Sequence, residues 1–190
     1  MKCDVILAGV GGQGVLSVAS IIAQAAAGEG LCVRQSEVHG MAQRGGAVLA
    51  HLRISDDPIA GDLVPKGCAD IIISMEPLES LRYTDWLAPC GALVTAAEPL
   101  VNIGSYPQPE DITAAIRSFP LWRIIEAAKL AKEAGLPRTV NMVMVGAASP
   151  FLPIEAQHLE NTIAAAFEAK GPEVLEANTQ AFRLGRQAAA

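Results

Sequence analysis

A glycine-rich stretch near the start of the chain has the spacing of a phosphate-binding loop. The stretch Gly9-Val10-Gly11-Gly12-Gln13-Gly14 follows an apolar run at 3–8 and precedes a segment with helical periodicity at 15–28. Glycines let a backbone turn sharply and approach a ligand closely, and the N–H groups at the start of a helix attract anions. We therefore predict an anion- or phosphate-binding loop made by Gly9, Gly11, Gly12, Gln13 and Gly14. A purely structural turn between strand and helix explains the same residues equally well.

The same Gly-x-Gly-x-x-Gly spacing occurs in proteins that bind NAD. Glu37 even lies roughly where such proteins place the acid that contacts the ribose. However, Glu37 opens a second glycine-rich motif that NAD enzymes do not need, and no recognisable catalytic set follows it. A free-standing NAD(P)-binding oxidoreductase and a regulatory nucleotide-binding module are therefore kept as alternative functions.

The second motif runs from Glu37 to Gly46 with the sequence EVHGMAQRGG, and an alternating strand pattern follows at 47–55. Its glycines are consistent with a tight connection that needs positive φ angles. In that structural interpretation Arg44 pairs with a carboxylate at the edge of the core, and His39 is a satisfied loop residue. The residues alone leave this interpretation and a binding role open. His51, on the following strand, is expected to face a neighbouring strand and to be structural.

Strands and helices are expected to alternate along the chain. The short apolar runs are typical of strands in a sheet that is covered on both faces, and they predict strands at 3–9, 31–36, 47–55, 69–75 and 91–96. Helical periodicity predicts helices at 15–28, 112–118, 121–134, 153–169 and 172–187, whereas 139–148 suits either state. The expected fold is α/β: one doubly wound, Rossmann-like three-layer domain over residues 1–190, with a mostly parallel sheet and a helical C-terminal third.

Composition excludes several classes of function. The net charge is -6 and the 14 Lys and Arg residues are scattered, so a nucleic-acid partner is not expected. The four cysteines are not spaced for an iron–sulfur cluster or a zinc site, and no metal site is predicted from Cys3, Cys32, Cys68 and Cys90. No secretion signal and no apolar run of about 20 residues is present, so we expect a cytoplasmic protein without a membrane span.

Together the two glycine motifs resemble the gamma-type domain of pyruvate and 2-oxoacid:ferredoxin oxidoreductases. The resemblance rests on GVGGQG, on EVHGMAQRGG and on the strand ending in HLRIS, and it extends to Asn141-Met142-Val143, Gly146 and the late helix. Many members have a tyrosine-glycine-proline-glutamate stretch before the arginine. The version at 39–46 is more similar to the indolepyruvate branch, namely the beta subunit of indolepyruvate:ferredoxin oxidoreductase.

The resemblance implies a complex that converts a 2-oxoacid and the co-substrate coenzyme A to acyl-CoA and carbon dioxide, with electrons passing to ferredoxin. Thiamine diphosphate and [4Fe-4S] clusters carry that chemistry. This chain lacks the thiamine motif, since Gly61-Asp62 is followed by Leu63, and it lacks cysteines with cluster spacing. The resemblance therefore implies that a large partner subunit holds both cofactors and that this chain is inactive alone.

The resemblance also implies a role for the second motif at a subunit boundary, near the channel for the substrate or coenzyme A. Arg44 would then supply a fixed positive charge for a carboxylate or phosphate, and His39 and Gln43 would be neutral donors. The residues expected to contribute to this active-site or interface region are Glu37, His39, Gln43, Arg44, Gly45 and Gly46.

Overall fold

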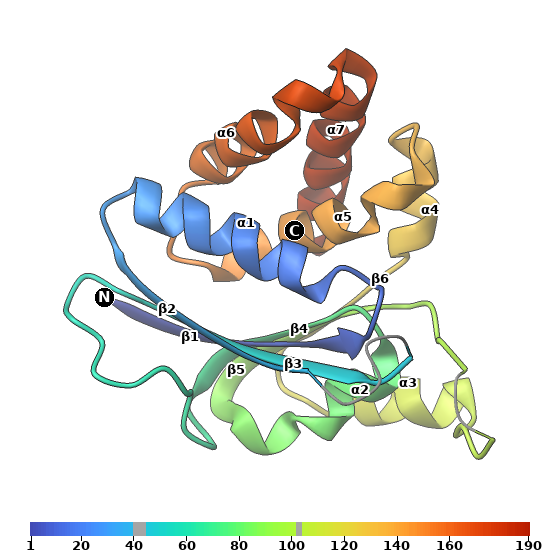
Figure 1. The fold of residues 1–190 in the computed structure, drawn as a ribbon. Coiled ribbons are helices and arrows are strands. Elements are labelled where there is room, and N and C mark those ends of the chain that lie inside the picture. Colours follow the sequence, from blue (N-terminus) through green and yellow to red (C-terminus); the bar gives the residue numbers. More distant parts are fainter. Residues whose placement is uncertain (40–44, 102–103) are drawn as a thin grey trace.

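The chain forms a central sheet with helices on both faces, as the computed structural model in Figure 1 shows. The structure describes the backbone of residues 1–39, 45–101 and 104–190, and the side chain of His39 is not described. The strands are β1 Lys2–Val10, β2 Cys32–His39, β3 Ala47–Ser55, β4 Ala69–Ser74, β5 Leu87–Ala96 and β6 Trp122–Ile125. The α-helices are α1 Val15–Gly28, α2 Pro77–Arg82, α3 Pro109–Arg117, α4 Ala127–Glu133, α5 Val140–Ala148, α6 Ala156–Phe167 and α7 Pro172–Ala189.

The six strands lie in the order β2-β3-β1-β4-β5-β6. β1, β4, β5 and β6 pair in parallel, whereas β3 is antiparallel to both of its neighbours, β1 and β2. All strands except β3 therefore point the same way, and their carboxyl ends meet at one edge of the sheet. The predicted α/β fold with a mostly parallel, doubly wound sheet is confirmed.

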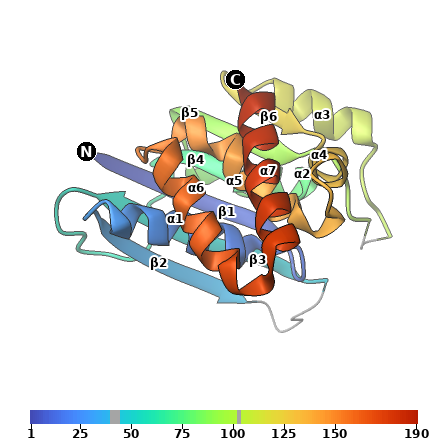
Figure 2. The same ribbon diagram turned by 90° about the horizontal axis from the view of Figure 1, so that it is seen from above.

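Two hydrophobic layers sandwich the sheet. In Figures 1 and 2, α1, α4, α5, α6 and α7 cover one face, and α2 and α3 lie against the other face. Alternate residues of β1 point into the two hydrophobic layers. Val5 and Leu7 belong to the larger core beneath α1, and Ile6 belongs to the smaller core on the face covered by α2 and α3. This double burial explains the almost uninterrupted apolar sequence of β1.

Helices α5 and α7 cross at two glycines. An added Cβ at Gly146 would lie 2.0 Å from the carbonyl oxygen of Phe182, and one at Gly185 would lie 1.9 Å from that of Val143. Neither separation is sterically possible, so both helices depend on glycine for their close approach. This crossing fixes where α5 begins, and the first residues of α5 form one wall of the site described below.

A loop over residues 56–68 packs beneath β3 at the amino-terminal edge of the sheet. Arg53 Nε donates to the fully buried Asp4 carboxylate at 2.7 Å, and Arg53 Nη1 donates to the carbonyl of Gly61 at 3.0 Å. His51 is buried, and its Nδ1 accepts a hydrogen bond from Val64 N at 3.2 Å. Burial lowers the pKa of His51, which keeps the ring neutral. His51 is therefore structural, as predicted, although its partner is this loop.

Three segments differ from the expectation. The single helix predicted at 121–134 was wrong: the chain forms strand β6 and then the shorter helix α4. The segment at 139–148, which suited either state, is the 3-10 turn Pro137–Thr139 followed by α5. Helix α2 was not predicted. It begins with Pro77 and is capped by Glu76, whose side chain accepts from Glu79 N.

Candidate functional site

A large cavity lies at the carboxyl edge of the sheet, where β1 and β4 end side by side. The helices that follow these strands, α1 and α2, lie on opposite faces of the sheet (Figure 1), and the cavity lies beside the strand ends. Such a switch point is where open α/β sheets bind ligands. The cavity measures about 570 Å³ and is lined by Gly12, Gln13, Gly14, Met75, Ala96, Glu98, Ala128, Pro137, Arg138, Val140 and Asn141.

The predicted glycine loop forms one wall of this cavity. Gly12 and Gly14 have φ angles of 103° and 83°, in the left-handed region that glycine favours. Gly9 needs glycine for space, because a Cβ there would lie 2.8 Å from Val15 Cγ2. No described residue accepts from the N–H groups of Gly12, Gly14 or Val15. The loop therefore presents unpaired donors at the start of α1, which is the arrangement that an anion needs.

Gln13 joins the two strands that frame the crevice. Its Oε1 accepts from Val10 N at 2.7 Å, and its Nε2 donates to the carbonyl of Met75, just after β4, at 3.2 Å. Both ends of this amide are therefore engaged within the protein. Gln13 was predicted to belong to the anion-binding loop, and the structure assigns its side chain a positioning role there.

The two glycine motifs meet in space. Gly11 N donates to the carbonyl of Gly46 at 2.8 Å, and Gly45 N donates to the carbonyl of Gly11 at 3.4 Å. The antiparallel β2–β3 pair makes this contact possible, because it returns the chain alongside β1. Gln43 and Arg44, which were predicted to contribute to the site, lie outside the described residues, as does the side chain of His39.

Glu37 is not placed where an NAD-binding protein would need it. It lies near the end of β2, opposite Ala50 of β3, and β3 separates it from β1. Two strand spacings put it roughly 10 Å from the glycine-bearing strand. In NAD-binding folds the ribose-binding acid ends the strand adjacent to the glycine loop. This strand order therefore disfavours the NAD interpretation.

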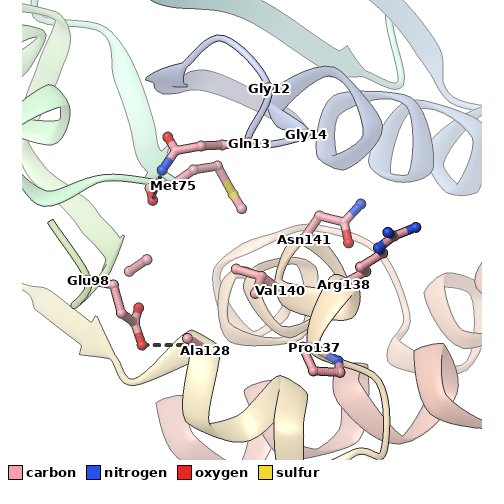
Figure 3. A pocket seen from close by; sticks show the side chains of 11 residues that line it. Gly12, Gln13, Gly14, Met75, Glu98, Ala128, Pro137, Arg138, Val140 and Asn141 are labelled. Atoms are coloured by element: carbon pink, nitrogen blue, oxygen red, sulfur yellow. Dashed lines mark hydrogen bonds between the residues drawn. The ribbon is translucent and has the colours of Figure 1, made fainter. Parts of the chain in front are cut away.

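The opposite wall comes from the start of α5 and the end of β5. Figure 3 shows Glu98 and Arg138 on different sides of the cavity, with Asn141 between Arg138 and Gly14. Glu98 Oε1 accepts from Ala128 N at 2.8 Å and so anchors the start of α4. Arg138 is exposed, and no described group pairs with it. An anion would therefore bind on the Arg138 side, and a hydrogen-bond donor would suit the Glu98 side.

Arg138 and Glu98 were not predicted from the sequence. A signal for Arg138 was nevertheless present, since a cation just before a helix opposes the helix dipole. Neither α1 nor α5 has an acidic residue in its first turn or a side-chain cap. The start of α1 and Arg138 thus border a single cavity, and both favour an anion there.

Possible metal ligands are not clustered among the described residues. These residues contain no group of three or more His, Cys, Asp and Glu placed to hold a metal ion. The cysteines are unpaired, and burial raises the pKa of Cys3 to about 12, so this thiol is protonated. Asp62, in the stretch compared with a thiamine motif, lies at the amino-terminal edge of the sheet, where its Oδ1 is 3.8 Å from Arg34 Nε. No described helix is both long and apolar enough to cross a membrane.

The chain matches the family described as pyruvate ferredoxin/flavodoxin oxidoreductase over residues 4–188. It is 38% identical to the indolepyruvate oxidoreductase subunit IorB of Pyrococcus horikoshii, an alignment that covers 98% of this chain and 95% of the relative. It is 29% identical to the 2-oxoglutarate synthase subunit KorC of Methanothermobacter marburgensis, over 98% of this chain and 96% of that subunit.

Solved structures show the same fold. One is a 2-oxoglutarate:ferredoxin oxidoreductase from Magnetococcus marinus with 2-oxoglutarate, coenzyme A and succinyl-CoA bound. It has a TM-score of 0.79 and 26% identity, covering 99% of this chain and 31% of that longer chain. The gamma subunit of a keto/oxoacid ferredoxin oxidoreductase from Geobacter sulfurreducens has a TM-score of 0.73 and 22% identity, covering 100% and 97% of the two chains.

Proposed function

This chain belongs to the pyruvate ferredoxin/flavodoxin oxidoreductase family, and we propose that its glycine-loop cavity supplies part of the coenzyme A site of an indolepyruvate:ferredoxin oxidoreductase. It is a subunit of a 2-oxoacid:ferredoxin oxidoreductase, close to the indolepyruvate enzymes. The proposed reaction joins an aryl 2-oxoacid and coenzyme A to give acyl-CoA and carbon dioxide, with electrons passing to ferredoxin.

Enzymes of this class use thiamine diphosphate and iron–sulfur clusters. The thiamine group stabilises the carbanion left by decarboxylation, and the clusters take up the electrons. We assign both groups to a large partner subunit, because the described residues of this chain offer neither a ligand set nor a thiamine motif. The contribution of this chain is then to bind and orient a reactant.

The observation that carries the proposal is the cavity at the ends of β1 and β4. The N–H groups of Gly12 and Gly14 and the guanidinium of Arg138 can hold a phosphate of coenzyme A. The amide-bearing arm of coenzyme A has N–H groups, and Glu98 can accept one, because no described group donates to its second carboxylate oxygen. Gln13 keeps the glycine loop against β4 and so sets the width of the cavity.

The second glycine motif borders the same loop. Because Gly45 and Gly46 bond to Gly11, the ends of the segment at 37–46 reach this edge of the sheet. We propose that Arg44 and His39 extend the site toward the partner subunit, with Arg44 as a further charge for a carboxylate or phosphate.

An assay of the assembled complex tests the role of the cavity. Arg138→Ala is expected to raise KM for coenzyme A about tenfold, because one charge-assisted hydrogen bond is lost. KM for indolepyruvate should stay unchanged. Lys132→Ala on α4 is the matched control, since Lys132 is exposed and lines none of the described cavities. An Arg138→Ala complex with unaltered KM for coenzyme A would remove this cavity from the coenzyme A site.

The partner subunit is proposed to cover the same edge of the sheet. Among the described residues, three large apolar side chains are exposed near this edge: Val38 lies close to the carboxyl end of β2, and Leu100 and Val101 lie in the loop after β5. Three strands separate β2 from β5, so these exposed apolar side chains lie on the two sides of the glycine-loop cavity, and exposed apolar surface marks interaction sites. Val101 is 69% exposed, so Val101→Asp should weaken co-purification of the partner without lowering the melting temperature. Leu63→Asp, at the opposite edge, is the control and should leave assembly intact.

A further inference from the structure

A second cavity lies on the other side of the turn that opens α5. It measures about 430 Å³, and it shares Arg138 and Asn141 with the glycine-loop cavity. Leu136 and Thr139 of the turn before α5 line it as well, and its other walls come from the end of α6, the turn after it and the first half of α7. None of the residues singled out by the two glycine motifs lines it. Pockets of this size hold small organic ligands.

The floor of this second cavity combines apolar surface with one buried amide. Leu136, Phe167 and Val174 supply the apolar surface. Asn178 is only 3% exposed, and its Nδ2 donates to the carbonyl of Val174 at 2.7 Å. No described group donates to its Oδ1, although this side chain lines the cavity. A nearly buried carbonyl oxygen therefore remains available to a ligand N–H.

Two cations stand at the rim. Arg138 has no described partner, and Lys170 lies 4.8 Å from the centre of the Phe167 ring. Such a cation–π contact is worth only about 0.5–1 kcal/mol at an exposed site. A charge-assisted hydrogen bond to a phosphate is stronger, at about 1.5–3 kcal/mol, so Lys170 can turn from the ring to an anion. No carboxylate lines this cavity, so nothing in its wall offsets these charges.

We propose that this second cavity binds a phosphorylated purine nucleoside. The phosphate lies between Arg138 and Lys170, the base lies on the apolar floor, and an N–H of the base donates to Asn178 Oδ1. Two separate cations suit a phosphate, which carries about two negative charges, better than a single carboxylate. This inference rests on the proposed function in one respect: the nucleotide end of coenzyme A is one source of this chemistry, reaching across the turn from the first cavity. A free nucleotide is the other source.

Titration calorimetry on the full chain tests this assignment with ADP, coenzyme A, inorganic phosphate and indolepyruvate as probes. ADP should bind, and Lys170→Ala should weaken its binding about tenfold through the lost charge-assisted contact. Asn178→Leu should weaken it by a similar factor while the melting temperature shows that the variant is folded. Lys132→Ala is the control and should leave the affinity for ADP unchanged. If Lys170→Ala weakens the binding of both ADP and coenzyme A, the nucleotide end of coenzyme A is the source; if it weakens only the binding of ADP, a free nucleotide is the source.

The proposal is overturned if ADP does not bind, or if the affinity for ADP is unchanged in both the Lys170→Ala and the Asn178→Leu variants. It is also overturned if inorganic phosphate or indolepyruvate binds as tightly as ADP. These failures are separable from failure of the proposed function. A KM for coenzyme A that depends on Arg138, combined with no ADP binding, leaves the first cavity in place and removes the second. If instead ADP binding depends on Lys170 and the KM for coenzyme A is unchanged in Arg138→Ala, the second cavity is retained as a nucleotide site and the first is removed from the coenzyme A site.

Discussion

Replacing Gln13 by alanine tests whether this side chain holds the crevice together. The change removes the bond from Val10 N at 2.7 Å and the bond to the Met75 carbonyl at 3.2 Å. Val10 and Met75 are 2% and 4% exposed, so water replaces these partners poorly. At about 1 kcal/mol for each bond, the free energy of unfolding should fall by about 2 kcal/mol. For a chain of this length that corresponds to a melting temperature lower by roughly 4–8 °C.

Thermal and urea unfolding of the isolated chain measure this effect. Gln24→Ala is the matched control, because Gln24 is an exposed residue of helix α1, which follows the Gln13 loop, and its side chain bonds only the Ser20 hydroxyl. Its effect should stay within about 0.5 kcal/mol. If Gln13 served a ligand instead of the fold, Gln13→Ala would unfold like the wild type and would only weaken ligand binding. A loss of stability below about 0.5 kcal/mol would therefore refute the positioning role.

Three further predictions concern packing, the second motif and pH. Gly146→Ala should lower the free energy of unfolding by about 3 kcal/mol or more, because the added methyl forces α5 away from α7. Gly28→Ala is the control: its Cβ meets nothing, so the variant should be no less stable than the wild type in the same unfolding assay. Arg44→Ala should lower turnover of the assembled complex roughly tenfold with little change in melting temperature; normal turnover with a large stability loss would make Arg44 a scaffold residue. Burial lowers the pKa of His51 in the folded state. The neutral ring therefore contributes its full stabilisation above the pKa of an unfolded-state histidine, about 6.5, and this stabilisation is lost as the pH falls through the folded-state pKa. His51→Asn should flatten this dependence in urea titrations, and an unchanged slope would contradict it.

Long periodic segments and glycine spacing predicted most of the fold. The strand at 47–55 and the helix at 15–28 were predicted with the bounds that the structure shows. The prediction at 121–134 failed because the good helix formers lie only in α4, whereas Trp122, Ile124 and Ile125 favour a strand and pair with β5. Such pairing depends on a strand that lies far away in sequence, so local periodicity does not contain it.

The candidate site was predicted only in part. The glycine loop does line the cavity, but Arg138 and Glu98 come from segments whose proximity depends on how α5 and β5 are placed. The contact between Gly11 and Gly46 likewise depends on the antiparallel course of β3, which no local pattern specifies. The sequence therefore predicted a binding edge, and the tertiary structure was needed to complete its walls.

The position of β1 at the centre of the sheet has a consequence for synthesis of the chain on the ribosome. β1 emerges first, yet its two neighbours are β3 and β4, and β4 ends at Ser74. At about 5–20 residues per second, the nascent β1 and the apolar helix α1 wait several seconds for those strands. Helices α5 and α7, which complete the layer over α1, arrive last. A truncated nascent chain thus exposes its most apolar strand, so translation pauses before Ser74 should increase its dependence on chaperones.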